Sequence, residues 1–300
     1  MSRPPSGTAL AAAAGRAAHL IVDGVPTIFE DTVALALLGP DAEEMIAVHR
    51  SSVDQEFSAG VRLIMTARSR YVENRLADAV RRGVDQYVVL GAGLDSFAYR
   101  SPLARHVRVF EVDHPYTQAW KRQRLAHAGV AVPAQVEFVA VDFENDPLRE
   151  RLTGAGFDVS KPSFVSWLGV TPYLTHEAVT ATFAALGALA AGTEVTAEYV
   201  LPTDLRDGGG RRLADQVIRA VAALGEPWLT FFSPAEMTDL LGSCGFAVVE
   251  QVGQREQVDT VFWERSDGLH PIELTRLARA VVRVVGQPTE AIDQCGNRPS

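Results

Sequence analysis

The residues that could do chemistry stand where apolar runs end. A Gly-Ala-Gly turn at 91–93 follows the apolar run 87–90, and Asp95 comes two positions later. A glycine turn after a buried strand lets the backbone come close to a ligand. The next strand-like run ends at Glu111, where an acid can accept hydrogen bonds from both hydroxyls of a ribose. The spacing predicts a nucleoside-containing cofactor across the carboxyl ends of a parallel sheet.

The glycine turn also bears on which nucleoside this is. A nicotinamide fingerprint has a third glycine where Ser96 stands, and it holds a pyrophosphate on a helix N-terminus. Here Asp95 stands at the start of that helix. A carboxylate opposes a pyrophosphate but tolerates the ammonium of an amino-acid moiety. The turn therefore favours S-adenosyl-L-methionine over NAD, with S-adenosyl-L-homocysteine as the product.

Further polar positions are candidates for the same site, each with a structural alternative. Asp142 and Phe143 follow the third strand-like run. The acid suits the exocyclic amine of an adenine, although it could instead cap a helix. Arg68 and Arg70 lie on the helix before the first strand, and one of them could pair with the methionine carboxylate. The alternative for both is a solvated helix face.

The acceptor chemistry is less determined by the sequence. Methyl transfer to a carboxylate needs no general base, whereas a phenol or alcohol benefits from one, and histidine is the commonest choice. The candidates are Tyr173, His176 and His49, each of which could instead be a packing, capping or surface residue. We expect four aromatic residues to line an apolar pocket for a ring-containing acceptor: Tyr173, Tyr199, Trp228 and Phe231.

The elements that must position these residues alternate between strands and helices after residue 85. Such alternation predicts an α/β fold with a parallel sheet and helices on both faces. The expected strands are Gln86–Leu90, Val107–Val112, Val136–Val141, Ser163–Gly169, Glu194–Tyr199, Ala247–Gln251 and Thr260–Trp263. The connection between the last two is too short for a crossover helix, so they should form a closing antiparallel hairpin. Seven strands with that ending are typical of Rossmann-like class I methyltransferases.

The domain organisation follows from the same reading. Residues 1–84 read as a helical cap and residues 85–300 as the core, together one compact unit. Residues 201–235 interrupt the alternation after the fifth strand, at the edge that faces the ligand. An insertion there is placed to act as a lid, or else as a packing appendage.

Composition excludes several classes of partner. The net charge of −9 argues against nucleic acid and anionic membranes. No apolar run approaches the length of a membrane span, and no signal peptide is recognisable. Cys244 and Cys295 do not suggest a disulfide framework, so a cytoplasmic location fits. No metal site is expected, and the oligomeric state is left open.

Several motifs in order resemble the leucine carboxyl methyltransferase-like family, which includes many bacterial O-methyltransferases of secondary metabolism. The resemblance runs from about Thr8 to Leu269. It rests on Gly91-Ala92-Gly93-Leu94-Asp95-Ser96, Phe110-Glu111-Val112-Asp113-His114-Pro115, Val141-Asp142-Phe143, Gly169-Val170-Thr171-Pro172-Tyr173-Leu174, Gly225-Glu226-Pro227-Trp228 and Arg265-Ser266-Asp267-Gly268-Leu269.

The resemblance implies a class I methyltransferase dependent on S-adenosylmethionine, acting on a carboxylate or hydroxyl of a small metabolite. By this resemblance Arg68 holds the methionine carboxylate, and Glu111 holds the ribose. Gly91 approaches the amino-acid moiety, while Asp142 and Phe143 hold the adenine. The expected cofactor set is completed by Ala92, Gly93, Asp95, Val112 and Gly169.

One position departs from the family pattern. The family usually has a glutamate directly before the glycine of the fourth-strand motif, near the methionine end of the cofactor, and this chain has Leu168. The change could weaken cofactor binding, open the pocket to an apolar substrate, or belong to a protein that binds the cofactor without transferring its methyl group. N- or C-methylation, a non-methylating cyclase and an NAD-dependent oxidoreductase are the alternative functions.

Overall fold

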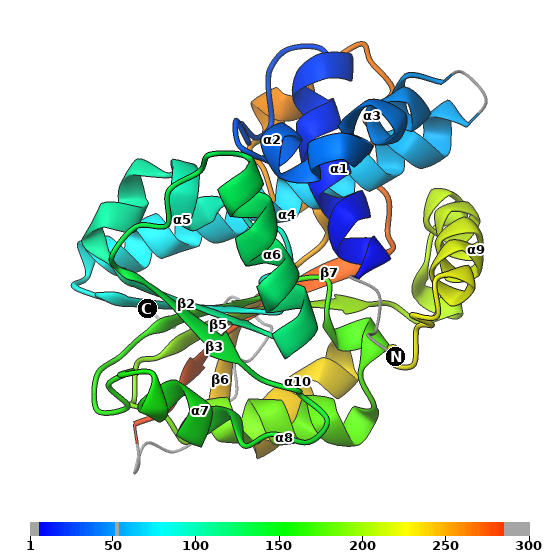
Figure 1. The fold of residues 1–300 in the computed structure, drawn as a ribbon. Coiled ribbons are helices and arrows are strands. Elements are labelled where there is room, and N and C mark those ends of the chain that lie inside the picture. Colours follow the sequence, from blue (N-terminus) through cyan, green and yellow to red (C-terminus); the bar gives the residue numbers. More distant parts are fainter. Residues whose placement is uncertain (1–5, 52–53, 285–300) are drawn as a thin grey trace.

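A twisted seven-stranded sheet crosses the computed structural model, which describes residues 6–51 and 54–284 (Figure 1). The strand order is β3-β2-β1-β4-β5-β7-β6. The first five strands pair in parallel, and β7 runs antiparallel to both β5 and β6. Their bounds are β1 (Gln86–Leu90), β2 (Arg108–Asp113), β3 (Val136–Ala140), β4 (Phe164–Trp167), β5 (Glu194–Val200), β6 (Phe246–Val252) and β7 (Thr275–Val282). This confirms the predicted fold class.

The position of the seventh strand was predicted wrongly. Thr260–Trp263 forms a short 3-10 helix, and the strand that pairs with β6 lies at 275–282. Phe262 packs in a cluster with Ile28 and Leu63, away from the sheet. The true strand carries Arg279, whose charge is paired with Glu250 and Glu194 on the neighbouring strands. The closing antiparallel pair exists, but a long connection separates its two strands.

Helices cover both faces of the sheet, as Figure 1 shows. One face carries α7 (Leu148–Gly154), α8 (His176–Gly187) and α10 (Pro234–Ser243), whose apolar residues share one core with the strands. The other face carries α4 (Gln55–Arg81), α5 (Phe97–Arg100) and α6 (Pro115–His127). Helix α10 begins with a capping box in which Ser233 and Glu236 satisfy each other's backbone N–H groups.

The N-terminal helices pack against the second of these faces. They are α1 (Gly7–Val22), α2 (Ala34–Leu38) and α3 (Ala42–Arg50), and α1 lies along α4. Gly15 makes that close approach possible, because a Cβ there would lie 3.2 Å from Met65 Cγ of α4, while alanines 13, 14, 17 and 18 are buried in a cluster with residues of α2 and α3. Arg16 of α1 pairs with Asp31 at 2.8 Å and donates to the backbone oxygen of Leu94 at 2.7 Å. These contacts tie α1 to the turn after β1.

Helix α9 (Gly208–Ala223) lies in the insertion between β5 and α10, beside α4 and the start of α1 (Figure 1). Asp207 caps its first turn. The chain after it is fixed at its far end, since Thr230 Oγ1 donates to the backbone oxygen of Thr171 at 2.7 Å.

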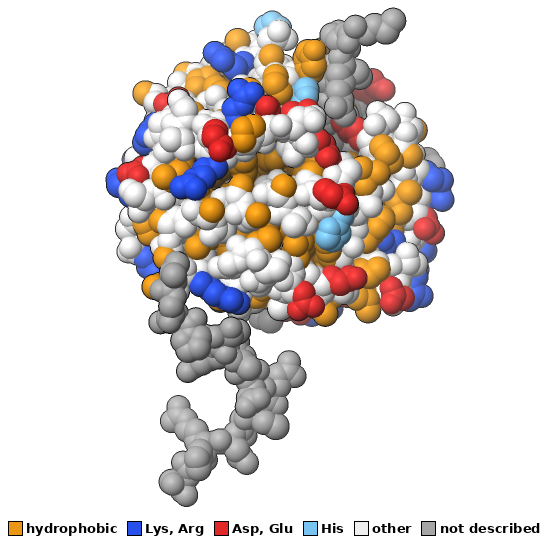
Figure 2. Space-filling view, turned by 90° about the horizontal axis from the view of Figure 1, so that it is seen from below, with side chains coloured by type: hydrophobic (Ala, Val, Ile, Leu, Met, Phe, Trp, Pro, Cys, Tyr) orange, Lys and Arg blue, Asp and Glu red, His pale blue; other side chains and the backbone are white. Residues whose placement is uncertain are grey.

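Figure 2 shows Lys and Arg side chains interspersed with Asp and Glu on the face seen from below. Among the described helices, none has the length and apolarity needed to span a membrane. Cys244 is a free cysteine, and Cys295 lies outside the described residues.

Candidate functional site

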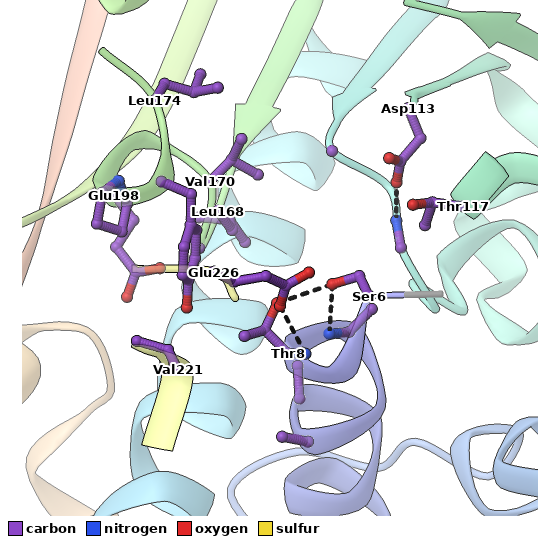
Figure 3. A pocket seen from close by; sticks show the side chains of 18 of the residues that line it. Ser6, Thr8, Asp113, Thr117, Leu168, Val170, Leu174, Glu198, Val221 and Glu226 are labelled. Atoms are coloured by element: carbon purple, nitrogen blue, oxygen red, sulfur yellow. Dashed lines mark hydrogen bonds between the residues drawn. The ribbon is translucent and has the colours of Figure 1, made fainter. Parts of the chain in front are cut away.

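A cavity of about 600 Å³ opens at the carboxyl ends of the parallel strands. Its walls come from the segments that follow β1 to β4, from β5 itself, and from α1, α4 and α9. In Figure 3, Asp113 and Thr117 lie on one side of the cavity, while Leu168, Glu198 and Val221 lie on the other. A volume of this size is ordinary for a small-molecule site.

The glycine turn forms the floor where the two sides meet. Gly91 has φ of +67°, and a Cβ there would lie 2.2 Å from Val170 Cγ2. No other residue type fits that space and that backbone conformation. Asp95 closes the turn by donating its N–H to the oxygen of Ala92 at 2.6 Å, and its carboxylate accepts from Phe97 N at 2.9 Å. The Phe97 N–H at the start of α5 could otherwise bind a phosphate, but it already donates to the Asp95 carboxylate.

Asp113, at the end of β2, is the acid that faces the cavity. Its two carboxylate oxygens accept from Gly93 N at 2.5 Å and from His114 N at 2.7 Å (Figure 3). Burial raises the pKa of this carboxyl, and the two N–H donors oppose the shift. A carboxylate has about four acceptor positions, so the contacts leave capacity for a ligand. With Asp95, Asp142 and Glu144 it gives this part of the cavity, hereafter the nucleoside end, four acids.

Glu111, which the sequence assigned to the ribose, lies outside the cavity wall. Its carboxylate is 2.7 Å from Lys121 Nζ of α6, and both residues are 1% exposed. Burial raises the pKa of Glu111, while Lys121 lowers it. Val112 is also fully buried in the core and does not line the cavity.

Asp142 and Phe143 both line the nucleoside end, as expected. The Asp142 carboxylate accepts from Glu144 N at 3.1 Å and from Asn145 Nδ2 at 2.9 Å. It therefore also organises the turn after β3, rather than capping a helix, which was the structural alternative. The ring of Phe143 lies 6.2 Å from that of Trp167 and gives this end an aromatic wall.

Arg68 and Glu198 form a buried ion pair on the opposite side of the glycine turn. Arg68 is 8% exposed and Glu198 is 3% exposed. The guanidinium lies against Gly169, where a Cβ would come within 2.9 Å of Nη1. Arg70, the other candidate, donates instead to the backbone oxygen of Ile28 and faces away from the cavity.

Beyond this ion pair the cavity becomes apolar. We call this part the apolar compartment. It is lined by α4, α9, the chain after α9, the end of β5 and the residue before β7, through Phe57, Val61, Ile64, Met65, Val200, Val217, Ala220, Val221, Leu224, Trp228, Leu229 and Leu274. Ile64 stands one helical turn before Arg68, and Val200 stands two residues after Glu198 on the same strand face. The ion pair thus lies between the glycine turn and the apolar compartment.

The expected catalytic and pocket residues divide between two places. Tyr173 and Trp228 line the cavity, and burial raises the pKa of the Tyr173 phenol. Tyr199 is fully buried and donates its hydroxyl to Gln251, while Phe231 is 37% exposed, with Arg206 over its ring. Neither lines the cavity, and Tyr199 belongs instead to the core that α7, α8 and α10 share with the sheet.

Neither histidine candidate reaches the cavity. His49 is buried on α3, where burial and Arg62 lower its pKa to about 4. His176 is exposed at the start of α8, with its ring 5.2 Å from that of Phe232. The titratable groups on the compartment side are Arg68, Tyr173, Glu198 and Glu226.

Two important residues were not found as site residues from the sequence. Asp113 was named from the sequence only within a motif, whereas in the structure it accepts from the N–H groups of Gly93 and His114 and faces the cavity. Glu198 lies inside a strand that read simply as buried. An acid in the middle of the run 194–200 was the signal available, since a buried charge needs a partner or a ligand.

The donor set fits S-adenosylmethionine. Acids at the nucleoside end can accept from ribose hydroxyls and an adenine amine, and an opposite-charge pair stands where an amino-acid moiety would lie. In the described part of the chain, no group of three or more His, Cys, Asp or Glu side chains could hold a metal ion.

Solved structures share this architecture. A crystal structure from Thermobifida fusca YX, described as "a putative methyltransferase", superposes with a TM-score of 0.58 at 20% identity, covering 86% of this chain and 97% of that one. A DUF574 family protein from Streptomyces avermitilis MA-4680 gives a TM-score of 0.60 at 16% identity, covering 90% and 97%. The fold is that of the class I methyltransferases.

Sequence comparisons identify the family. The leucine carboxyl methyltransferase model matches residues 9–187. The Bacillus subtilis (strain 168) protein named "Putative S-adenosyl-L-methionine-dependent methyltransferase YktD" is 30% identical over 298 residues, covering 91% of this chain and 97% of that protein. The chain belongs to the leucine carboxyl methyltransferase family, and its cofactor is S-adenosylmethionine. An NAD-dependent oxidoreductase is thereby ruled out.

Proposed function

We propose that this methyltransferase methylates an oxygen, a carboxylate or hydroxyl, on a small and largely apolar metabolite or natural-product intermediate. The observation that carries the proposal is the apolar compartment, which continues the cavity past the Arg68–Glu198 pair. Oxygen as the methylated atom is supported by the description of the family, which names carboxyl methylation. The interspersed charges and the net charge of −9 support a small molecule rather than a nucleic acid.

Residues at different places along the cavity have different roles. Asp113 and Asp142 bind the nucleoside, Gly91 and Gly93 let the backbone approach the amino-acid moiety, and Arg68 binds its carboxylate. The bound cofactor supplies an electrophilic methyl group. The compartment walls align the acceptor oxygen for in-line attack and exclude water. A carboxylate acceptor needs no base, and for a hydroxyl acceptor Tyr173 is the sequence candidate that lines the cavity.

We also propose that residues 201–235 act as a lid over the apolar compartment and that the helices of residues 1–84 and the core of residues 85–300 work as one unit. Support comes from α9, which lines the compartment, and from α1, which lines the same cavity. The backbone N–H of Thr8 donates to Glu226 Oε2 at 3.2 Å, joining the start of α1 to the chain after α9 (Figure 3).

The test uses cofactor with a labelled methyl group and acceptors that share one apolar skeleton but carry a carboxyl, a hydroxyl or an amine. We expect label on the carboxyl or hydroxyl compound, and mild alkali releases it from an ester but not from an ether. Labelling of the amine alone would contradict O-methylation.

A substitution in the apolar compartment tests whether the methyl acceptor binds there. Val221→Trp narrows the compartment and should raise the acceptor KM at least tenfold while leaving S-adenosylhomocysteine affinity unchanged. Val249→Trp makes the same change at a position that is 45% exposed on β6 and should alter neither value. An unchanged acceptor KM in the Val221 variant would place the acceptor elsewhere.

A further inference from the structure

Glu198 stands beside Leu168 at the cavity. β4 and β5 pair in parallel with Trp167 opposite Ala197, so Leu168 and Glu198 occupy the next positions of that register. Residues paired in this way lie on the same face of the sheet, about 4.8 Å apart across the two strands. Both side chains line the cavity, and Figure 3 shows them on the same side of it.

Glu198 is placed to bind a ligand as well as to pair with Arg68. It is 3% exposed yet lines the cavity. Arg68 contacts one of its oxygens, Oε2, and a carboxylate can accept about four hydrogen bonds. Thr171 Oγ1 donates to the backbone oxygen of Glu198 at 2.7 Å, which fixes this strand end against the turn that follows β4.

The charges of the pair complement those of an amino acid. An α-amino acid presents an ammonium and a carboxylate a few ångströms apart, and the pair offers a carboxylate and a guanidinium. The guanidinium of Arg68 lies against Gly169, next to the glycine turn, and can bind a carboxylate bidentately. An ammonium beside it needs an acidic partner, and Leu168 cannot provide one.

We propose that Glu198 supplies, from β5, the carboxylate that binds the ammonium of the cofactor's methionine moiety. This inference rests on the assignment of the cavity as the cofactor site. With Leu168 apolar on the neighbouring strand, Glu198 gives this end of the site its acid, and the site has the groups needed to bind the cofactor.

Two probes test the inference by calorimetry. S-adenosylhomocysteine carries the amino-acid moiety, and 5′-methylthioadenosine lacks it. Glu198→Gln should weaken binding of S-adenosylhomocysteine about tenfold or more, because a charge-assisted hydrogen bond is lost. Binding of 5′-methylthioadenosine should change less than twofold. Equal weakening of binding for both probes, as a general loss of structure would give, would overturn the inference. Unchanged binding of both probes would overturn it as well.

Glu194→Gln is the matched control. Glu194 lies on the same strand, is 5% exposed and pairs with Arg279 at 3.1 Å, but it does not line the cavity. Its substitution should leave the affinity for both probes unchanged.

A double variant that moves the acid from β5 to β4 tests whether binding survives the move. Leu168→Glu combined with Glu198→Leu returns the acid to β4 and should bind S-adenosylhomocysteine within about threefold of wild type. If this double variant does not fold, Glu198→Gln and its control decide. A wild-type protein that binds neither probe overturns the cofactor site and this inference with it, whereas wild-type binding with an indifferent Glu198→Gln variant overturns the inference alone.

Discussion

The buried pair of Glu111 and Lys121 allows a test of which acid at the nucleoside end binds the ribose and which is structural. The two charged groups are 2.7 Å apart and each residue is 1% exposed. Glu111→Gln leaves the ammonium of Lys121 buried without its counter-ion. Breaking a buried pair in this way costs about 3 to 5 kcal/mol, which for a chain of 300 residues corresponds to a melting temperature lower by roughly 5 to 8 °C.

Restoring charge balance should restore stability. Glu111→Met with Lys121→Met replaces the pair by apolar side chains, which is commonly close to neutral for such pairs. We expect denaturant unfolding to place the double variant within about 1 to 2 kcal/mol of wild type. Glu137→Gln is the control, because its partner Arg108 is 3.6 Å away and both side chains are more than 40% exposed. It should cost less than about 1 kcal/mol.

The double variant then separates two assignments of the ribose acid. If Asp113 binds the ribose, the double variant binds S-adenosylhomocysteine like wild type, and Asp113→Asn binds it about 10- to 100-fold more weakly. Asp113→Asn should weaken 5′-methylthioadenosine as well, since both probes contain the ribose. The reasoning fails if the double variant is as stable as wild type and no longer binds S-adenosylhomocysteine, because Glu111 would then be a direct ligand.

Two further predictions concern the glycine turn and the helical cap. Gly91→Ala should lower the free energy of unfolding by at least about 2 kcal/mol more than Gly83→Ala does, because its methyl group would overlap Val170. It should also abolish S-adenosylhomocysteine binding. Gly83 has φ of +96° with nothing within 4 Å of a Cβ, so Gly83→Ala measures backbone strain alone. Burial and Arg62 hold the pKa of His49 at about 4 in the folded protein, against 6.5 as its reference value, so the unfolded state binds more protons below pH 6.5. Stability should therefore fall as the pH is lowered from 6.5 toward 4, by up to about 1.4 kcal/mol per pH unit, and His49→Gln should flatten that slope in unfolding measured from pH 7 to 5.

The sequence predicted best the elements whose local pattern matches their environment. The first four strands are largely apolar runs with glycine or an acid at their end or within two residues of it, and the structure has all five parallel strands within a residue or two of the expected bounds. β7 was missed because arginines at 276 and 279 interrupt its apolar pattern. Arg276 pairs with the nearby Glu273, whereas the charge of Arg279 is balanced by Glu194 and Glu250, which are distant in sequence.

The site residues show the same division. Glu111 and Asp113 lie two residues apart on one strand face, so the alternation of a strand cannot tell which of them reaches the cavity. Lys121, contributed by α6, holds Glu111 in the interior and leaves Asp113 at the wall. Glu198 likewise gains its meaning from Arg68, which is 130 residues away in the chain.

The strand order determines when the sheet can be completed during synthesis on the ribosome. β7 lies between β5 and β6, so β6 has no partner strand and β5 keeps an open edge until residues 275–282 have been made. Open strand edges pair readily with other chains. The nascent protein can therefore build its cofactor end early, while β6 and the open edge of β5 wait for the last strand to be inserted between them.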